Sequence, residues 1–277
     1  MSASRETSTG SKQLAGWAAA LLGAVCGFQL TSWLAVYSPS APLIAYLYGF
    51  ACVVSSTLGV AWFVPAARWP ALTGAVLGVV AMVLALLSPP GQVDVSPALC
   101  VLIGLLVLGT ALGALIGRRI QHPSHLLFVA LVSSVADILS LTQPGGISKA
   151  IAEEPRALAL LALPWPLLGS DEIAPFLGVS DVVFASLYLH ASRAHVLPQL
   201  RSVVALILGF ALTALLVLLL QRPIPVLPLL GVCIVLAQPR ARTASAEDWR
   251  RGAWVLAALV IVIATVFLRR SQCLLSQ

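Results

Sequence analysis

The sequence predicts an all-α polytopic membrane protein with about nine transmembrane helices, and two observations lead to the membrane class. Of the 277 residues, 60% are hydrophobic and only 9% are charged, whereas soluble domains carry about 25% charged residues. The mean hydropathy is +1.00, and apolar runs near the roughly 20 residues needed to cross a bilayer recur along the whole chain. These features exclude a water-soluble domain. We interpret the net charge of +6 as favouring contact with anionic lipid headgroups, and not as a sign of nucleic-acid binding.

Proline, glycine and charged residues divide this apolar sequence into segments. Residues 1–13 are polar and rich in Ser and Thr, so we expect a disordered tail before one transmembrane domain over residues 14–268. Segment 157–170 is apolar but too short and too proline-rich to span, and we expect a re-entrant or interfacial piece there. The predicted spans are 14–36, 43–64, 71–88, 97–117, 125–143, 175–191, 201–220, 225–237 and 252–268.

Glycine spacing indicates how these spans pack, and the distribution of charged residues indicates how they are oriented in the membrane. Glycines four residues apart let helices approach closely in lipid, which favours a packing role. Eleven of the 16 Lys and Arg residues fall on the side of the N-terminus, which favours a cytoplasmic N-terminus in a multi-pass protein of a prokaryotic membrane. The glycines concerned are Gly74, Gly78, Gly109, Gly113 and Gly117.

The cysteines and histidines predict neither a cofactor nor a metal site. The cysteine count is five, without close pairs, and four of the cysteines lie inside predicted spans, where Cys usually acts as a small hydrophobe. His122 and His125 flank a proline in a loop, and His190 and His195 lie at the end of a span.

Two acidic residues stand out because they interrupt apolar spans. Eight of the ten acids lie in the tail, loops or helix ends, whereas Asp137 and Asp181 lie within spans. A charged side chain at the bilayer centre costs about 2.5–3.5 kcal/mol on insertion scales. Such acids either accept hydrogen bonds between helices, stay protonated, or carry the function.

If the two carboxyls meet, both cannot ionise at neutral pH, and the pair shares one proton. That state suits amide hydrolysis, because the ionised partner takes a proton from water and the protonated partner polarises the carbonyl. It also suits proton or ion transport, and periodicity does not choose between the two. Three serines near Asp137 form a polar stripe that would admit water: Ser133, Ser134 and Ser140.

Three stretches, in order, resemble the presenilin and signal peptide peptidase family of intramembrane aspartyl proteases. Residues 130–154, ALVSSVADILSLTQPGGISKAIAEE, resemble its Tyr-Asp helix and the Pro-Gly turn and amphipathic segment that follow. Residues 176–191, FLGVSDVVFASLYLHA, resemble its Gly-x-Gly-Asp helix, and residues 219–231, LLQRPIPVLPLLG, resemble its Pro-Ala-Leu segment. The resemblance implies a presenilin-like bundle, with a catalytic core over residues 125–237 after four N-terminal spans over 14–117.

The resemblance also implies the site residues. Asp137 and Asp181 correspond to the catalytic pair, while substrate would be bound by Gly178, Ser180, Pro225, Val226 and Leu227. The chain departs from the family pattern at Ala136, Ser180 and Val226. We expect the last two to add bulk where room is scarce, although the Ser180 hydroxyl could instead bond a carboxylate.

The implied substrates are transmembrane helices of membrane proteins, with the lipid bilayer as the other partner. Residues 157–170 would then supply a strand edge that pairs with an unwound substrate. The family places its catalytic acids on spans six and seven, whereas our count places them on five and six, which implies an inverted site. Two alternatives stay open: an ion- or proton-coupled transporter using the same acids, and a non-catalytic membrane chaperone.

Overall fold

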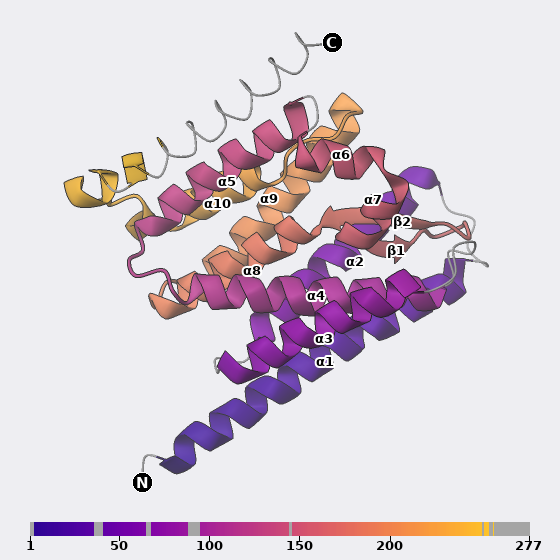
Figure 1. Cartoon of the computed structure of the whole chain (residues 1–277), viewed down its shortest axis with the longest axis horizontal. Coiled ribbons are helices and arrows are strands. Elements are labelled where there is room, and N and C mark those ends of the chain that lie inside the picture. The colour runs from indigo at the N-terminus through magenta and orange to yellow at the C-terminus, as the bar shows by residue number, and fades with distance from the viewer. Residues whose placement is uncertain are drawn as a thin grey trace.

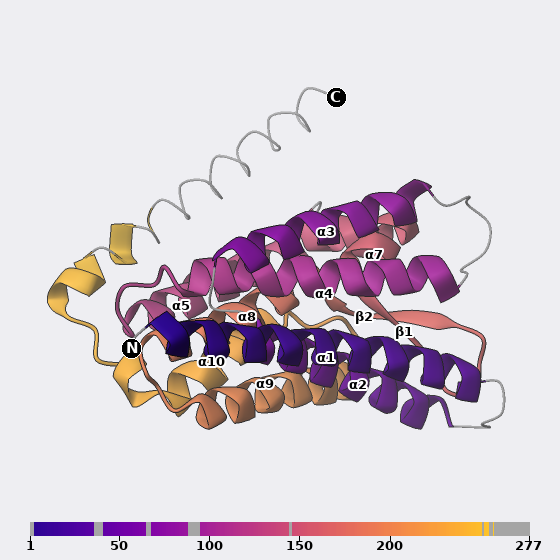
Figure 2. The same cartoon turned by 90° about the horizontal axis from the view of Figure 1, so that it is seen from below.

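The computed structural model describes residues 3–35, 41–64, 68–87, 95–143, 146–250, 252–254 and 257. These residues form a helical bundle with one short β-hairpin at one end (Figures 1 and 2). The predicted all-α membrane class is confirmed at this level. In chain order the elements are α1 (Ala3–Ala35), α2 (Pro42–Phe63), α3 (Arg68–Leu87), α4 (Val95–Gly117), α5 (His125–Thr142), α6 (Ile147–Glu153), α7 (Pro155–Leu161), β1 (Ala162–Pro166), β2 (Ile173–Gly178), α8 (Val179–Ala194), α9 (Gln199–Leu220), α10 (Leu227–Ala237) and η1 (Pro239–Ala241).

Five described helices are long and apolar enough to cross a membrane, and two further apolar helices are shorter. The chain is therefore a membrane-associated protein. The predicted final span, 252–268, lies almost entirely outside the described residues. The five candidate spans are Ser11–Ala35, Pro42–Phe63, Pro97–Gly117, His125–Thr142 and Gln199–Leu220, and the shorter apolar helices are Thr73–Val83 and Leu227–Ala237.

The structure differs from the predicted layout in two places, the N-terminal tail and the sixth predicted span. Helix α1 already begins at Ala3, so residues 3–13, predicted as a disordered tail, are its first turns. Adding turns to an existing helix is far easier than nucleating a new one. The predicted span 175–191 is divided into strand β2 and helix α8, because Pro175 and Gly178 disfavour a helix there.

Glycines bring helix α4 into close contact with its neighbours, as the four-residue spacing predicts. A Cβ atom at Gly113 would lie 2.2 Å from the Val183 carbonyl oxygen of α8, and one at Gly117 would lie 2.5 Å from the Leu187 carbonyl oxygen. On its other side, α4 contacts α3 where Gly78 meets Gly104. Only residues without a Cβ permit these backbone approaches. Helix α4 therefore packs directly against the backbone of α8.

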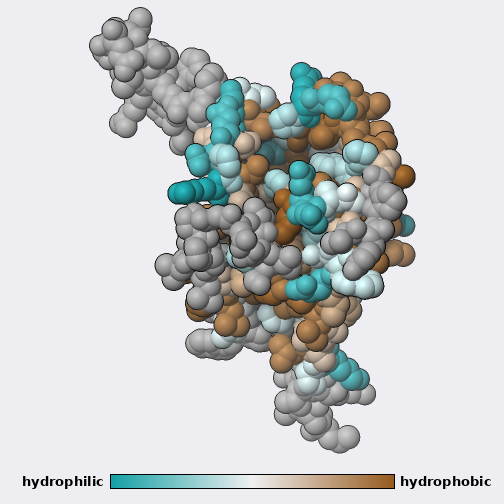
Figure 3. Space-filling model, turned by 90° about the vertical axis from the view of Figure 1, so that its right-hand side faces the viewer, coloured by the Kyte–Doolittle hydropathy of each residue, from teal (hydrophilic) through white to brown (hydrophobic). Residues whose placement is uncertain are grey.

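The β-hairpin is antiparallel and precedes α8 directly. Strand β1 is buried along its whole length, with Trp165 packed edge-on against Phe28 of α1 at a ring-centroid distance of 5.6 Å. Strand β2 is held to α2 by Phe176, whose ring fills the space left by Gly49. Segment 157–170 therefore contains a strand: its middle residues, Ala162–Pro166, are buried in the bundle, while the residues on either side are half-buried or exposed. Figure 3 views the hairpin end, where hydrophilic residues lie near the middle.

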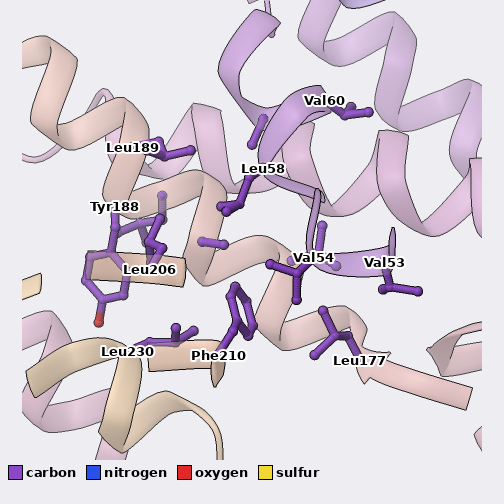
Figure 4. Packing of buried hydrophobic residues seen from close by; sticks show 14 of the residues in the cluster. Val53, Val54, Leu58, Val60, Leu177, Tyr188, Leu189, Leu206, Phe210 and Leu230 are labelled. Atoms are coloured by element: carbon purple, nitrogen blue, oxygen red, sulfur yellow. The ribbon is translucent and has the colours of Figure 1, made fainter. Parts of the chain in front are cut away.

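The core joins α8 to the C-terminal helices. Helix α10 packs between α5 and α9, and α8 contacts α9 and α10. Figure 4 shows Tyr188 of α8 close to Leu206 of α9 and Leu230 of α10. This arrangement brings the N-terminal ends of α8 and α10 towards α5, where the site lies.

Candidate active site

Asp137 lies on α5 at the start of α10. Its Oδ2 atom accepts a hydrogen bond of 3.0 Å from the backbone N–H of Leu227, the first residue of α10. The N–H groups of the first helical turn have no partner within the helix, and the helix dipole is positive at that end. The α10 N-terminus therefore stabilises a negative charge on Asp137, which is half-buried.

Asp181 lies in the first turn of its own helix. It is the third residue of α8, and its Oδ2 atom accepts a 3.0 Å hydrogen bond from the backbone N–H of Gly178, which precedes the helix. This contact is one half of a capping box, in which the third side chain satisfies the N–H of the cap residue. The side chain is 6% exposed. Burial, a backbone donor and a helix N-terminus thus act on one carboxyl.

The two aspartates lie close enough to interact electrostatically, although they are 44 positions apart in the chain. Like charges that meet in a low-dielectric interior favour a state in which the pair retains one proton. Each carboxyl is also fixed by a donor from a different segment: the start of α10 for Asp137 and the end of β2 for Asp181. Such a pair can donate a proton at one oxygen and accept one at another.

The other predicted site residues divide into two groups. Gly178, Val226 and Leu227 lie beside the carboxyls, since Gly178 and Leu227 donate to them and Val226 caps α10. Pro225 is half-buried in the irregular segment just before α10. Ser180 is exposed, and no hydrogen bond between it and either aspartate exists among the described residues.

Ser180 is thus the second residue of α8 and is exposed, and its hydroxyl lies near Gly178 at the edge of the site. Even Gly178 is not sterically required. A Cβ atom there would lie 3.5 Å from both Asp181 Oδ2 and Ser180 Oγ, which is ordinary van der Waals contact.

The serine stripe near Asp137 is largely used for local bonding. Ser133 and Ser134 both donate to the Ala130 carbonyl oxygen, at 3.1 and 2.6 Å. Ser140 donates to Ser148 Oγ at 2.7 Å and accepts from the Ser148 N–H at 2.8 Å, which joins α5 to α6. Of the three, only Ser133 is buried.

A second buried polar group was not predicted from the sequence. Gln238 donates to Ser202 Oγ at 2.9 Å, and Ser202 bonds Ser192 Oγ at 2.8 Å, so these side chains connect the ends of α8, α9 and α10. Ser192 and Gln238 are 46 positions apart, and no periodic pattern or sequence motif connects the three residues. Among the described residues, no group of three or more His, Cys, Asp or Glu is arranged to hold a metal ion.

Comparisons with protein-family models, with curated proteins and with solved structures gave no match to this chain. The assignment of a function therefore depends on the geometry of the two aspartates and on the sequence stretches around them.

Proposed function

We propose that this protein is an intramembrane aspartyl protease of the presenilin and signal peptide peptidase type. Its substrates would be transmembrane helices of membrane proteins, and Asp137 and Asp181 would form the catalytic pair. One observation carries the proposal: two acids on separate apolar helices interact electrostatically, and each is held by a backbone N–H. The insertion cost of two such acids, about 2.5–3.5 kcal/mol each, favours a functional reason for keeping them.

The geometry suits acid–base hydrolysis of an amide. The ionised aspartate takes a proton from water as the water oxygen bonds the carbonyl carbon, and the protonated partner donates to the carbonyl oxygen. The proton taken from water then passes to the leaving nitrogen as the C–N bond breaks, while a hydroxyl of the tetrahedral intermediate returns its proton to the other aspartate, which restores the pair. Since helix N-termini face both carboxyls, the charged partner keeps its stabilisation without bulk water.

The β-hairpin supports the same proposal from the substrate side. A peptide bond inside a helix is shielded by its own hydrogen bonds, so a substrate must unwind before cleavage. Strand β2 leads directly into Gly178 and Asp181 and would align an extended segment with the pair by strand addition. Strand β1 is a poor target for a deletion test, because its burial makes it part of the fold.

The proposal includes a placement in the membrane. About nine spans, a cytoplasmic N-terminus and a prokaryotic cytoplasmic membrane agree with the charge distribution. The loop after Asp137 and the hairpin would then lie at the outer face, which is the inverted arrangement relative to presenilin.

The test uses purified protein with a fluorogenic transmembrane substrate. Asp137→Asn and Asp181→Asn should each lower cleavage by about 10²–10⁴-fold. The amide oxygen of Asn still accepts the hydrogen bond from Leu227 or Gly178, so the fold should persist in both variants. Asp171→Asn, which changes an exposed acid in the hairpin loop, is the matched control and should cleave like wild type.

An aspartyl transition-state mimic should inhibit the same cleavage. Undiminished cleavage by either site variant would refute the catalytic pair. Proton uptake in vesicles that needs both aspartates, without cleavage of any substrate, would identify a transporter instead. If the protein shows neither cleavage nor proton uptake, the remaining interpretation is a scaffold or chaperone.

A further inference from the structure

Arg193 is a half-buried arginine in the last turn of α8, in a part of the molecule that the proposed reaction does not use. Its guanidinium group donates a hydrogen bond to the Trp62 carbonyl oxygen near the end of α2 and lies 4.8 Å from the centre of the Trp62 ring. A guanidinium group has five N–H donors. No salt bridge joins Arg193 to a carboxylate within the part of the chain that the structure describes. The side chain therefore keeps its positive charge and has donors left for another partner.

Arg118, a second half-buried arginine, follows the last residue of α4. The backbones of α4 and α8 nearly touch here, since a Cβ atom at Gly117 would lie 2.5 Å from the Leu187 carbonyl oxygen. The charges of Arg118 and Arg193 lie close enough to repel each other, and His190 lies within electrostatic reach of both. Like charges held together away from bulk water are unfavourable unless an anion joins them. The fold thus brings basic side chains from two helices to one place.

These residues lie where a membrane surface would be. Trp62 is one residue before the end of one candidate span, and Arg118 is one residue after the end of another. Tryptophan prefers the level of the lipid headgroups. On α4, Leu112 and Ile116 are exposed and lie on one face of the helix, one turn apart, so they would contact acyl chains. An apolar surface below and two cations above match the two parts of an anionic lipid.

The chemistry of the arginines favours a phosphate group as the anion. Guanidinium groups bind phosphate oxygens through paired, charge-assisted hydrogen bonds. Helices α2, α4 and α8 all end here (Figure 1), and the negative ends of their dipoles weaken the attraction for a small free anion. A lipid overcomes this disadvantage, because its acyl chains already hold the headgroup at this level of the membrane. Basic sites between membrane helices bind anionic headgroups in this way.

We propose that Arg118 and Arg193 bind the phosphate of an anionic phospholipid between the ends of α4 and α8, beside Trp62. The phosphate oxygens accept hydrogen bonds from both guanidinium groups, and the negative charge removes their mutual repulsion. Since the two arginines belong to the ends of α4 and α8, the bound lipid strengthens the contact between these helices. The site does not depend on the proposed protease activity.

Native mass spectrometry of the full chain in detergent tests the site by titration with phosphatidylglycerol or with phosphatidylcholine, whose headgroup has no net charge. Wild type should bind phosphatidylglycerol several times more tightly. Arg118→Gln and Arg193→Gln should each weaken phosphatidylglycerol binding about fivefold, the factor that one Lys or Arg contributes near an anionic membrane surface. Their binding of phosphatidylcholine should stay the same. Equal affinity of wild type for the two lipids would overturn the site.

Arg240→Gln is the matched control, because Arg240 is an exposed arginine at the same end of the molecule. It should bind phosphatidylglycerol like wild type. An equal loss of binding in Arg240→Gln and Arg118→Gln would show an effect of overall charge and would overturn the site. Arg193→Gln also loses the contact with Trp62, whereas Arg118→Gln keeps it, so Arg118→Gln decides the matter if the other variant does not fold.

Inorganic phosphate separates a lipid from a free anion. In large molar excess it should leave phosphatidylglycerol binding unchanged, and displacement of the lipid would overturn the lipid assignment. A ligand that binds only the folded state stabilises it. Phosphatidylglycerol should therefore raise the thermal unfolding midpoint of wild type and Arg240→Gln more than that of Arg118→Gln, and an equal rise in all three would contradict the proposal. None of these measurements uses cleavage, so their failure is distinct from a failure of the protease proposal.

Discussion

Val196 occupies a backbone conformation that β-branched residues adopt only at a cost. Its φ is 52°, in the left-handed region, and it ends α8 in a Schellman motif: the Leu197 N–H donates to the Ser192 carbonyl at 2.8 Å and the Val196 N–H to Arg193 at 3.1 Å. Glycine is the usual residue here, because a Cβ costs about 1–2 kcal/mol in this conformation.

Val196→Gly should therefore stabilise the protein. The gain should be about 0.5–1 kcal/mol, because glycine also adds freedom to the unfolded chain. The side chain is 86% exposed, so no packing is lost. Thermal unfolding in detergent measures the effect, and a lower midpoint than wild type would show that the Val196 side chain contributes contacts that its exposure does not suggest.

Asp248 illustrates a titratable residue whose role lies in local structure outside the spans. Its Oδ2 atom accepts from the backbone N–H of Ser245 at 3.0 Å, and its own N–H donates to the Ser245 hydroxyl at 3.1 Å. The backbone N–H of Ser245, followed by its hydroxyl, lowers the pKa of Asp248 to about 2. Ser124 and His125 also contact this carboxylate.

Because the pKa of Asp248 is lowered on folding, its contribution is present above about pH 4 and is lost as the pH falls through about 2. We expect the hydrogen-exchange protection of the Ser245 amide to fall over that window in wild type. In Asp248→Ala the protection should be low at every pH. Protection that is equal in the two proteins at neutral pH would contradict the capping role.

The two aspartates could be identified from the sequence alone, because an acidic side chain within an apolar span is costly and therefore stands out without a structure. The exposure of Ser180 could not be predicted, since it depends on α8 beginning at Val179.

Among the elements, the contact between α4 and α8 is the one most sensitive to a single methyl group. Gly113→Ala would place a Cβ 2.2 Å from the Val183 carbonyl oxygen, a backbone atom that cannot rotate away. We expect destabilisation of about 1–3 kcal/mol. Since α8 carries Asp181 on the same helix, any cleavage activity should fall together with stability.

Gly59→Ala on α2 is the matched control, because nothing lies within 4 Å of a Cβ at that position. Alanine favours a helix over glycine by about 0.8–1.0 kcal/mol, so this variant should be at least as stable as wild type. Unfolding midpoints of the two variants, measured side by side, should move in opposite directions. A Gly113→Ala protein as stable as Gly59→Ala would contradict the close approach of α4 and α8.

The elements also show where sequence reasoning worked. Long apolar runs predicted α2, α4, α5 and α9 to within two residues at their ends, because bilayer crossing imposes length and hydropathy on them. The hairpin was not predicted as such. A short apolar run does not distinguish a strand from a buried helix, and the pairing of β1 with β2 depends on contacts across a turn.

For the whole molecule, the arrangement of the chain separates its charges between two ends. The loop 118–124, the turn 193–198 and the segment 238–250 gather at the end where α1 starts (Figure 1), and the arginines of these segments lie there. The hairpin, α6 and α7 lie at the opposite end, which carries Lys149 and Arg156. The sequence alone predicted this asymmetry. Successive spans cross the membrane in opposite directions, so alternate loops lie on the same side.

From the positive-inside tendency we predict that the end where α1 starts faces the cytoplasm, and cysteine accessibility tests this prediction. Ala194→Cys and Asp171→Cys place a thiol at exposed positions on the two opposite ends. In intact cells, a membrane-impermeant maleimide should label Asp171→Cys and should leave Ala194→Cys unlabelled until the membrane is opened. Wild type sets the background from its native cysteines, four of which lie within helices. The reverse pattern would place the hairpin in the cytoplasm, and the two aspartates would then receive their water from the other face of the membrane.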